Sequence, residues 1–89
     1  MDIKKVGVLG AGTMGAGIAQ VCAEAGLRVV MVDVEKTALE KAIKGVNKSW
    51  QKAVEKGKID EAAKSQRAAL VTTSTDIADL SDCDVVIEA

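Results

Sequence analysis

The chain has 89 residues, a formal net charge of −1, 48% hydrophobic residues and no histidine. A chain of this length builds one small hydrophobic core, so it forms one domain or part of one. Because the charge is near zero and the basic residues form no dense block, nucleic acid is excluded as an expected partner.

The segment 6–21 is the only one that superficially resembles a signal peptide or a membrane span. It is rich in glycine, contains Thr13 and Gln20, and is shorter than the roughly 20 apolar residues that a membrane span needs. We therefore expect no membrane partner.

Cys22 and Cys83 lack metal-ligand spacing, so we expect no metal site and two free thiols in a cytoplasmic protein.

The first third of the chain predicts a strand, a helix and a second strand. The run 6–9 is rich in β-branched residues and predicts a strand that ends at Gly10. A helix follows, and its buried face is predicted from apolar residues at helical spacing, which are Met14, Ile18, Val21, Cys22 and Ala25. Gly26 ends this helix as a left-handed cap. The run 28–33 predicts a second strand, covered on both faces because four consecutive residues are apolar.

The remaining residues predict two helices and two strands. An apolar helical stripe comprises Leu39, Ala42, Ile43, Val46, Trp50, Ala53 and Val54. Gly57 ends that helix, and Asp60 caps a second helix that extends through Arg67. The run 69–73 predicts strand three, and 84–88 predicts strand four after a brief helical turn around 77–80.

This alternation of strands and helices predicts an α/β fold. Right-handed crossovers give a Rossmann-type, doubly wound parallel sheet of strand order 3-2-1-4. Strand four is then an edge with an uncovered face, where a natural domain seldom finishes. We therefore expect residues 1–89 to be the truncated, N-terminal part of a longer protein.

The segment 10–15 has the sequence GAGTMG and lies between the first strand and the first helix. This is the context that the dinucleotide-binding fingerprint requires. Gly10 makes a tight turn, Gly12 lets the backbone approach a pyrophosphate, and Gly15 lets the helix lie close to the strand. The candidate cofactor-binding residues of this loop are therefore Gly10, Ala11, Gly12, Thr13, Met14 and Gly15.

Asp33 follows the second strand at the position where a dinucleotide site needs a carboxylate for the adenine ribose hydroxyls. Its negative charge disfavours a 2′-phosphate and so favours NAD over NADP, although Lys36 is a nearby basic residue. The alternative is structural: Asp33 merely opens a turn, and the glycines merely pack the helix against the sheet.

Three segments, KKVGVLGAGTMGAGIAQVCAEAG, VVMVDV and DVVIEA, carry a resemblance to the 3-hydroxyacyl-CoA dehydrogenase family, most closely to its short 3-hydroxybutyryl-CoA members. The resemblance spans the whole chain. It implies NAD-linked interconversion of 3-hydroxyacyl-CoA and 3-ketoacyl-CoA, in fatty acid or butanoate metabolism. It also implies an extended helical pair after strand two that reaches toward coenzyme A. A helical domain that forms a homodimer is expected to follow. The related β-hydroxyacid dehydrogenases tend to have leucine at the position of Ala11 and a proline in the next helix.

The resemblance further implies that Ser49 and Lys56 contact the coenzyme A part of the substrate. Seven residues apart, they share one helix face. The alternative is a solvated helix face, to which we assign the intervening Lys52. Ala89 resembles the family position that borders the ribose and nicotinamide of the cofactor.

No catalytic residue is expected within residues 1–89. The family uses a histidine paired with a glutamate as its base, with serine and asparagine partners, all after strand four. Without a base the hydroxyl proton has no acceptor, so we predict that this piece alone is inactive although the parent protein is an enzyme. The alternatives are a non-catalytic, stand-alone dinucleotide-binding module and a folded fragment without affinity.

Overall fold

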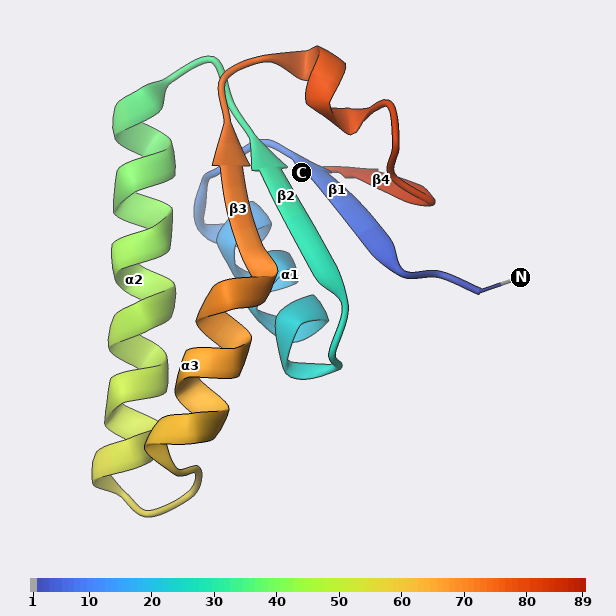
Figure 1. Cartoon of the computed structure of the whole chain (residues 1–89). Coiled ribbons are helices and arrows are strands. Elements are labelled where there is room, and N and C mark those ends of the chain that lie inside the picture. The colour runs from blue at the N-terminus through green and yellow to red at the C-terminus, as the bar shows by residue number, and fades with distance from the viewer. Residues whose placement is uncertain (1) are drawn as a thin grey trace.

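The structure, a computed structural model, describes residues 2–89. Strands and helices alternate along the chain (Figure 1). The strands are β1 (Lys5–Leu9), β2 (Arg28–Val32), β3 (Val71–Ser74) and β4 (Val85–Glu88). The helices are α1 (Thr13–Glu24), α2 (Lys36–Glu55), α3 (Glu61–Leu70) and the short 3-10 helix η1 (Ile77–Leu80).

All four strands form one parallel sheet in the order β3-β2-β1-β4, as the sequence predicted. The central strand β1 pairs on both sides, so that Val6 faces Val29 of β2 and Val85 of β4. The four apolar residues 29–32 of β2 are all buried, which confirms the prediction of a strand covered on both faces.

The two faces of the sheet are covered by different elements. Val8 and Met31 point into a core that also contains Ala19 of α1 and Leu39 of α2. Gly7, the residue before Val8 in β1, faces the opposite side of the sheet, where an added Cβ would lie 2.6 Å from Leu80 of η1. The α-helical crossovers therefore cover one face and the η1 connection covers part of the other, in agreement with a doubly wound fold.

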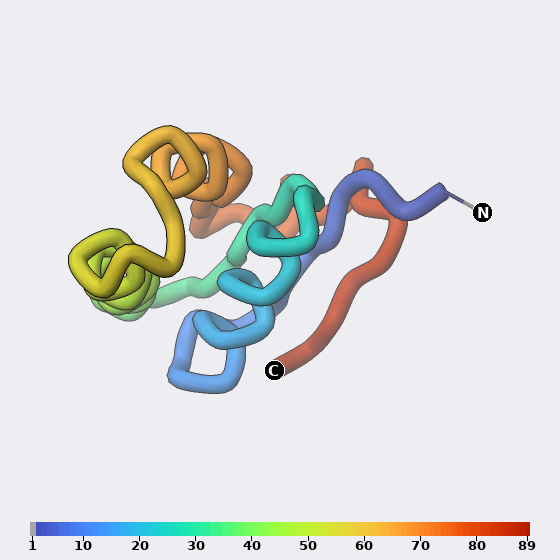
Figure 2. The backbone as a smooth tube through the Cα atoms, turned by 90° about the horizontal axis from the view of Figure 1, so that it is seen from below, coloured from blue at the N-terminus to red at the C-terminus, as the bar shows by residue number. Residues whose placement is uncertain are grey.

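Helices α2 and α3 form the predicted helical pair and extend beyond the amino ends of the strands (Figure 1; Figure 2 shows the same pair from below). Gly57 reverses the chain between them with a φ of 71°. The Asp60 side chain caps α3 by accepting a 2.8 Å hydrogen bond from the N–H of Ala63. Trp50, only 1% exposed, joins α2 to α1 in a second core cluster with Ala23 and Val46.

The predicted buried face of α1 is wrong. Met14 and Val21 are 69% and 65% exposed, and the buried residues of this helix are Gly15, Ala19 and Ala23. The reason is that Gly15 brings the helix backbone against β1, so the face of small residues at four-residue spacing packs on the sheet. Of the predicted face, Ile18 and Cys22 are half-buried.

The boundaries of the last two strands also differ from the prediction. Helix α3 continues through Leu70, and β3 begins at Val71 rather than at residue 69. Ala68 and Ala69 favour the helix, because alanine has the highest helix propensity. Strand β4 begins at Val85 rather than at residue 84. Asp84, just before it, joins the chain to β1, because its carboxylate accepts hydrogen bonds of 2.8 and 3.0 Å from the N–H groups of Lys4 and Lys5.

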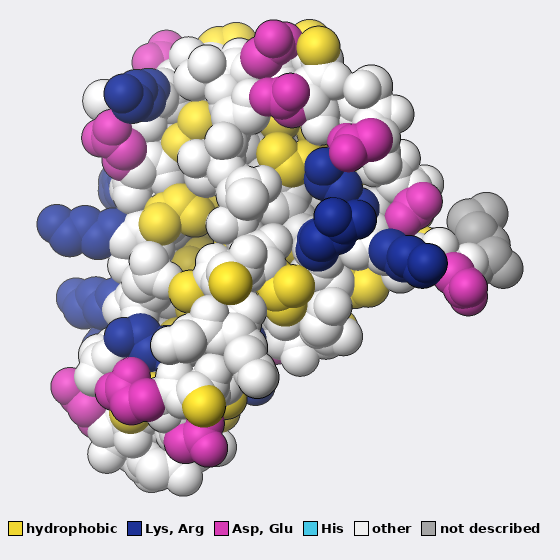
Figure 3. Space-filling model, in the orientation of Figure 1, with side chains coloured by type: hydrophobic (Ala, Val, Ile, Leu, Met, Phe, Trp, Pro, Cys, Tyr) yellow, Lys and Arg dark blue, Asp and Glu magenta, His cyan; other side chains and the backbone are white. Residues whose placement is uncertain are grey.

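The outer face of α2 is rich in lysine. Figure 3 shows lysine side chains that project from the molecule along this helix. The exposed lysines of α2 are Lys36, Lys41, Lys44, Lys48 and Lys52. Among the helices of residues 2–89, none combines the length and the apolar character needed to cross a membrane.

Candidate cofactor site

Gly10 makes the tight turn at the end of β1. Its φ of +111° lies in the region that side-chain-bearing residues avoid, and an added Cβ would lie 2.7 Å from the carbonyl oxygen of Ala89. Its N–H donates a 2.7 Å hydrogen bond to the carbonyl of Val32. The turn is therefore fixed between β2 and β4, and only glycine fits it.

Gly15 and Gly12 have opposite surroundings. A Cβ on Gly15 would lie 2.0 Å from the carbonyl oxygen of Gly10, so this glycine is required for contact between α1 and the loop. A Cβ on Gly12 would meet nothing within 4 Å. Gly15 thus meets the packing role predicted for it, and Gly12 leaves open space beside the backbone for a ligand.

The amino end of α1 is suited to an anion. The helix begins at Thr13, and Gly12 has no side chain to cap it. The N–H groups of the first helical turn have no partner within a helix and lie at the positive end of its dipole. Thr13 and Met14 are exposed, and the first turn contains no acidic residue. These N–H groups can bind phosphate oxygens.

Asp33 lies directly after β2 and is bonded to the glycine loop. Its Oδ2 accepts a 2.8 Å hydrogen bond from the N–H of Ala11, and its Oδ1 accepts a 2.9 Å hydrogen bond from the N–H of Glu35. These two bonds lower the pKa of the Asp33 carboxyl group below its ordinary value, and the bond from Glu35 has the larger effect. Each carboxylate oxygen has two lone pairs, so each can accept a further hydrogen bond from a ligand hydroxyl.

Ala89 follows β4 and lies beside the glycine loop. Its N–H donates a 2.9 Å hydrogen bond to the carbonyl of Leu9, and its own carbonyl oxygen lies against Gly10. The carboxyl ends of β1 and β4 therefore meet here, where the strand order reverses. Ligands of open α/β sheets bind at this kind of position.

A groove of about 580 Å³ begins at the glycine loop and runs between helices α1 and α2. It begins at Gly12 and Thr13, and small residues line most of its length, including Gly17 of α1 and Gly45 of α2. Gln20 lies at its α1 side. The groove thus connects the fingerprint loop to the middle of the α2 helix.

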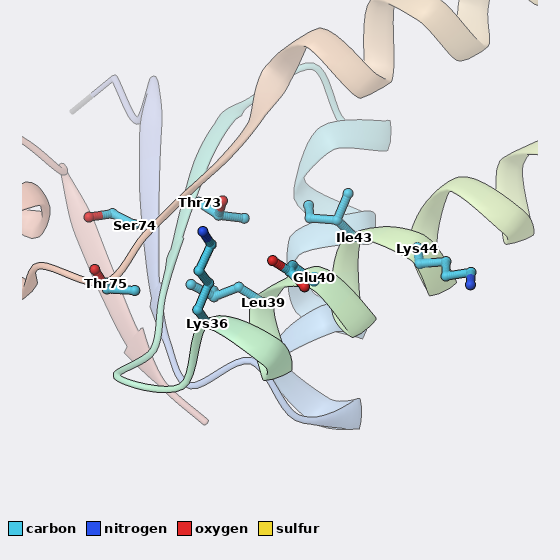
Figure 4. A pocket seen from close by; sticks show the side chains of 8 residues that line it. All are labelled: Lys36, Leu39, Glu40, Ile43, Lys44, Thr73, Ser74 and Thr75. Carbon is cyan, nitrogen blue, oxygen red and sulfur yellow. The ribbon is translucent and has the colours of Figure 1, made fainter.

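Lys36 lines a different cavity. Its side chain extends toward Thr73, and the cavity also contains Leu39 and Glu40 (Figure 4). The glycine loop lines the groove on the other side of α2. Lys36 therefore belongs to the β3 side of the molecule, and no residue of the fingerprint lines its cavity.

Ser49 and Lys56 lie on α2 and at its carboxyl end, and both are exposed. Ser49 Oγ accepts a 2.9 Å hydrogen bond from Nε2 of Gln20 on α1. The sequence interpretation missed the contact of Gln20 with Ser49, and it missed the bonds that Gln20 and Trp50 donate to Glu24. The only signal available was the four-residue spacing of Gln20 and Glu24 on one helix face.

Comparison with known proteins identifies the family. The sequence profile described as "3-hydroxyacyl-CoA dehydrogenase, NAD binding domain" matches residues 5–89. The chain belongs to this family of NAD binding domains. NAD is accordingly the cofactor of the domain, and the resemblance found in the sequence is confirmed.

Individual relatives of this NAD binding domain have related names. The 3-hydroxybutyryl-CoA dehydrogenase of Mycobacterium tuberculosis is 41% identical over 98% of the domain, which spans 30% of that relative. The 3-hydroxyadipyl-CoA dehydrogenase of Escherichia coli is 37% identical over all 89 residues, which span 19% of it. The chain thus covers less than a third of the length of these curated relatives.

Solved structures agree with the fold of this NAD binding domain. The crystal structure of (S)-3-hydroxybutyryl-CoA dehydrogenase from Ralstonia eutropha superimposes with a TM-score of 0.95 at 46% identity, covering 99% of this chain and 31% of that one. A lactate dehydrogenase from Cryptosporidium parvum has a TM-score of 0.64 at 24% identity. The second match shows the Rossmann-type fold alone.

Proposed function

We propose that this domain binds NAD with the residues predicted from the sequence: Gly10, Ala11, Gly12, Thr13, Met14, Gly15, Asp33 and Ala89. The observation that carries the proposal is the hydrogen bond between the Ala11 N–H and the Asp33 carboxylate. It joins the loop that suits a pyrophosphate to the carboxylate that suits a ribose. The two binding elements are therefore held in one arrangement before any ligand enters.

Each part of NAD has residues that fit it. The first-turn N–H groups of α1 and the open space over Gly12 suit the pyrophosphate. The spare lone pairs of Asp33 suit the two hydroxyls of the adenine ribose. A 2′-phosphate would meet the same negative charge, and Lys36 lines another cavity, so both features favour NAD over NADP.

We further propose that the whole protein is a 3-hydroxybutyryl-CoA dehydrogenase. NAD accepts a hydride from the 3-hydroxyl carbon of the acyl-CoA, which becomes the 3-ketoacyl-CoA. The hydroxyl proton needs a base, and residues 1–89 contain no histidine. In this proposal the base and a helical dimerisation domain lie outside residues 1–89, and this piece alone is inactive.

Ser49 and Lys56 are proposed to contact the coenzyme A part of the substrate. Ser49 is exposed on the lysine-rich helix α2, and Lys56 is exposed at the carboxyl end of that helix. The Lys56 ammonium group suits the phosphates of coenzyme A, and the surrounding lysines lower the cost of bringing their negative charge near.

We propose a cytoplasmic location, which the free thiols support. A role in fatty acid or butanoate metabolism follows from the proposed 3-hydroxybutyryl-CoA chemistry. Cys22 and Cys83 are unpaired in the described chain. Burial raises the pKa of both thiols, so they are less reactive than exposed cysteines. Two unpaired thiols fit a reducing compartment.

The test is a titration of the ¹⁵N-labelled chain with NADH, followed through the backbone amide signals. We expect shifts at Gly12, Thr13 and Gly15, and weaker binding of NADPH. A parallel assay with 3-hydroxybutyryl-CoA and NAD should show no turnover by this chain. Unchanged loop signals at millimolar NADH contradict the site, and turnover contradicts the assignment of the base to residues elsewhere.

A further inference from the structure

Four side chains form a continuous hydrogen-bonded row across the α1–α2 contact. Trp50 Nε1 donates a 2.9 Å bond to Glu24 Oε2, and the same oxygen accepts a 3.2 Å bond from Gln20 Nε2. Gln20 Nε2 then donates a 2.9 Å bond to Ser49 Oγ. The row runs from a buried indole to an exposed hydroxyl.

The chemistry of the row fixes the direction of every bond. The indole N–H of Trp50 is a donor only, and an ionised Glu24 carboxylate is an acceptor only. Gln20 must therefore turn its NH₂ group, not its carbonyl oxygen, toward Glu24. This settles the amide orientation, which a structure without visible hydrogens leaves open.

The same NH₂ group meets Ser49, so the Ser49 oxygen must accept. A serine hydroxyl carries a single proton, and that proton cannot point back at the Gln20 NH₂ group. Within residues 2–89 no acceptor takes a hydrogen bond from Ser49. Ser49 is exposed on α2, so its proton is left for an acceptor outside the described chain.

We propose that Gln20 is a positioning residue for coenzyme A. By donating to Ser49 Oγ, it directs the hydroxyl proton toward an oxygen acceptor on coenzyme A, while Glu24 and Trp50 hold the Gln20 amide in this orientation. The inference rests on the proposed contact between Ser49 and coenzyme A. It adds a residue on α1, which also lines the groove that leads from Gly12.

The anchoring end of the row gives it rigidity. Trp50 is 1% exposed and belongs to the α1–α2 core cluster, so its indole has one position. An exposed serine on a free helix would share its proton between water and the helix carbonyls. The bond from Gln20 keeps the Ser49 proton from turning toward α1, which leaves fewer orientations to be ordered on binding.

The test compares four variants of the chain in titrations with free coenzyme A. Gln20→Met keeps the length of the side chain and removes its donor, and Ser49→Ala removes the hydroxyl. The third variant combines both changes. Gln66→Met, at an exposed position of α3, is the matched control. Binding of NADH and the thermal unfolding midpoint are measured for each variant, as checks on the fold.

We expect Gln20→Met and Ser49→Ala each to weaken coenzyme A binding roughly five- to tenfold, and the double variant to be no weaker than Ser49→Ala alone. NADH binding and the control should be unchanged. In NMR spectra, Ser49→Ala should also shift the side-chain NH₂ signals of Gln20, which reports the Gln20–Ser49 hydrogen bond itself. The double variant separates the positioning role from a structural one, because only a residue that acts through Ser49 loses its effect once Ser49 is alanine.

Three outcomes would overturn the inference, and they are distinguishable. If Ser49→Ala weakens binding and Gln20→Met does not, or if the two effects multiply in the double variant, Gln20 does not act through Ser49. The contact of Ser49 with coenzyme A then stands. If Ser49→Ala leaves coenzyme A binding unchanged while NADH still binds, the proposed coenzyme A contact fails, and the inference fails with it.

Discussion

The Asp33 carboxylate and the backbone N–H of Ala11, 22 residues apart in sequence, are joined by a 2.8 Å hydrogen bond. The bond connects the carboxyl end of β2 to the middle of the glycine loop. Because a charged acceptor strengthens it, this contact fixes the loop more firmly than a neutral pair would. Asp33 therefore has two separable roles, one in the loop and one toward a ligand.

Replacement of Asp33 separates these roles. Asp33→Ala should weaken NADH binding by about ten- to a hundredfold, since both the ribose acceptor and the loop anchor are lost. Asp33→Asn keeps one acceptor oxygen, so its affinity for NADH should lie between the affinities of the native chain and of Asp33→Ala. Isothermal titration calorimetry of the three proteins gives the comparison. Equal affinity for NADH in all three would show that Asp33 is only a turn residue.

The pH dependence of stability follows from the same hydrogen bonds. They lower the pKa of Asp33 in the folded state below its ordinary value of 3.8. The charged form is then favoured by folding, so this contribution is fully present above pH 3.8 and is lost as the pH falls through the folded pKa.

We therefore expect the free energy of unfolding of the native chain to exceed that of Asp33→Asn at pH 7. The difference should shrink steadily below pH 3.8. Urea unfolding followed by circular dichroism at several pH values measures it. A difference that stays constant down to pH 2 would mean that the Asp33 charge contributes nothing to folding.

Two glycines of α1 should respond to alanine in opposite ways. Gly15→Ala places a Cβ 2.0 Å from the Gly10 carbonyl oxygen, so α1 must move away from the sheet. The free energy of unfolding should fall by several kcal/mol, as in a major disruption of the core. Gly17→Ala meets nothing within 4 Å and should stabilise the helix by about 1 kcal/mol. Thermal unfolding of both variants tests this contrast, and equal midpoints would refute it.

Trp50 should be the residue whose truncation costs most in α2. Trp50→Ala removes a side chain that is 1% exposed and should cost about 3–5 kcal/mol. That is a large part of the total stability of so small a domain. Ile77→Ala, at a 63% exposed position, is the control and should change stability by less than about 0.5 kcal/mol. Comparable losses of stability in the two variants would contradict the role of Trp50 in stabilising the core.

The element order and the glycine loop were predictable from the sequence because each rests on local signals. Gly10, Gly26 and Gly57 all have the positive φ that their turns require. The buried face of α1 was not predictable in this way. The contact between Gly15 and Gly10 brings glycine and alanine onto the sheet, whereas a hydrophobic pattern gives weight to large residues such as Met14 and Val21.

The neighbours of Ser49 were missed for a related reason. Gln20 and Ser49 are 29 residues apart in sequence, and the contact depends on how α1 and α2 cross. Periodicity within one helix carries no information about that crossing. The end of α3 has a different cause, since strand and helix signals compete in Ala68–Val71 and the helix propensity of alanine decides.

The central position of β1 has a consequence for the order of folding. Its two neighbouring strands lie at very different distances along the chain. β2 follows β1 after one short helix, whereas β4 comes much later, and the bond from Lys4 to Asp84 beside it joins residues 80 apart. Long loop closures are slow, so we expect β4 to join the sheet last. Gly10 then gains its neighbour Ala89 only at that step, and we expect the edge where the carboxyl ends of β1 and β4 meet to be the final part of the domain to form.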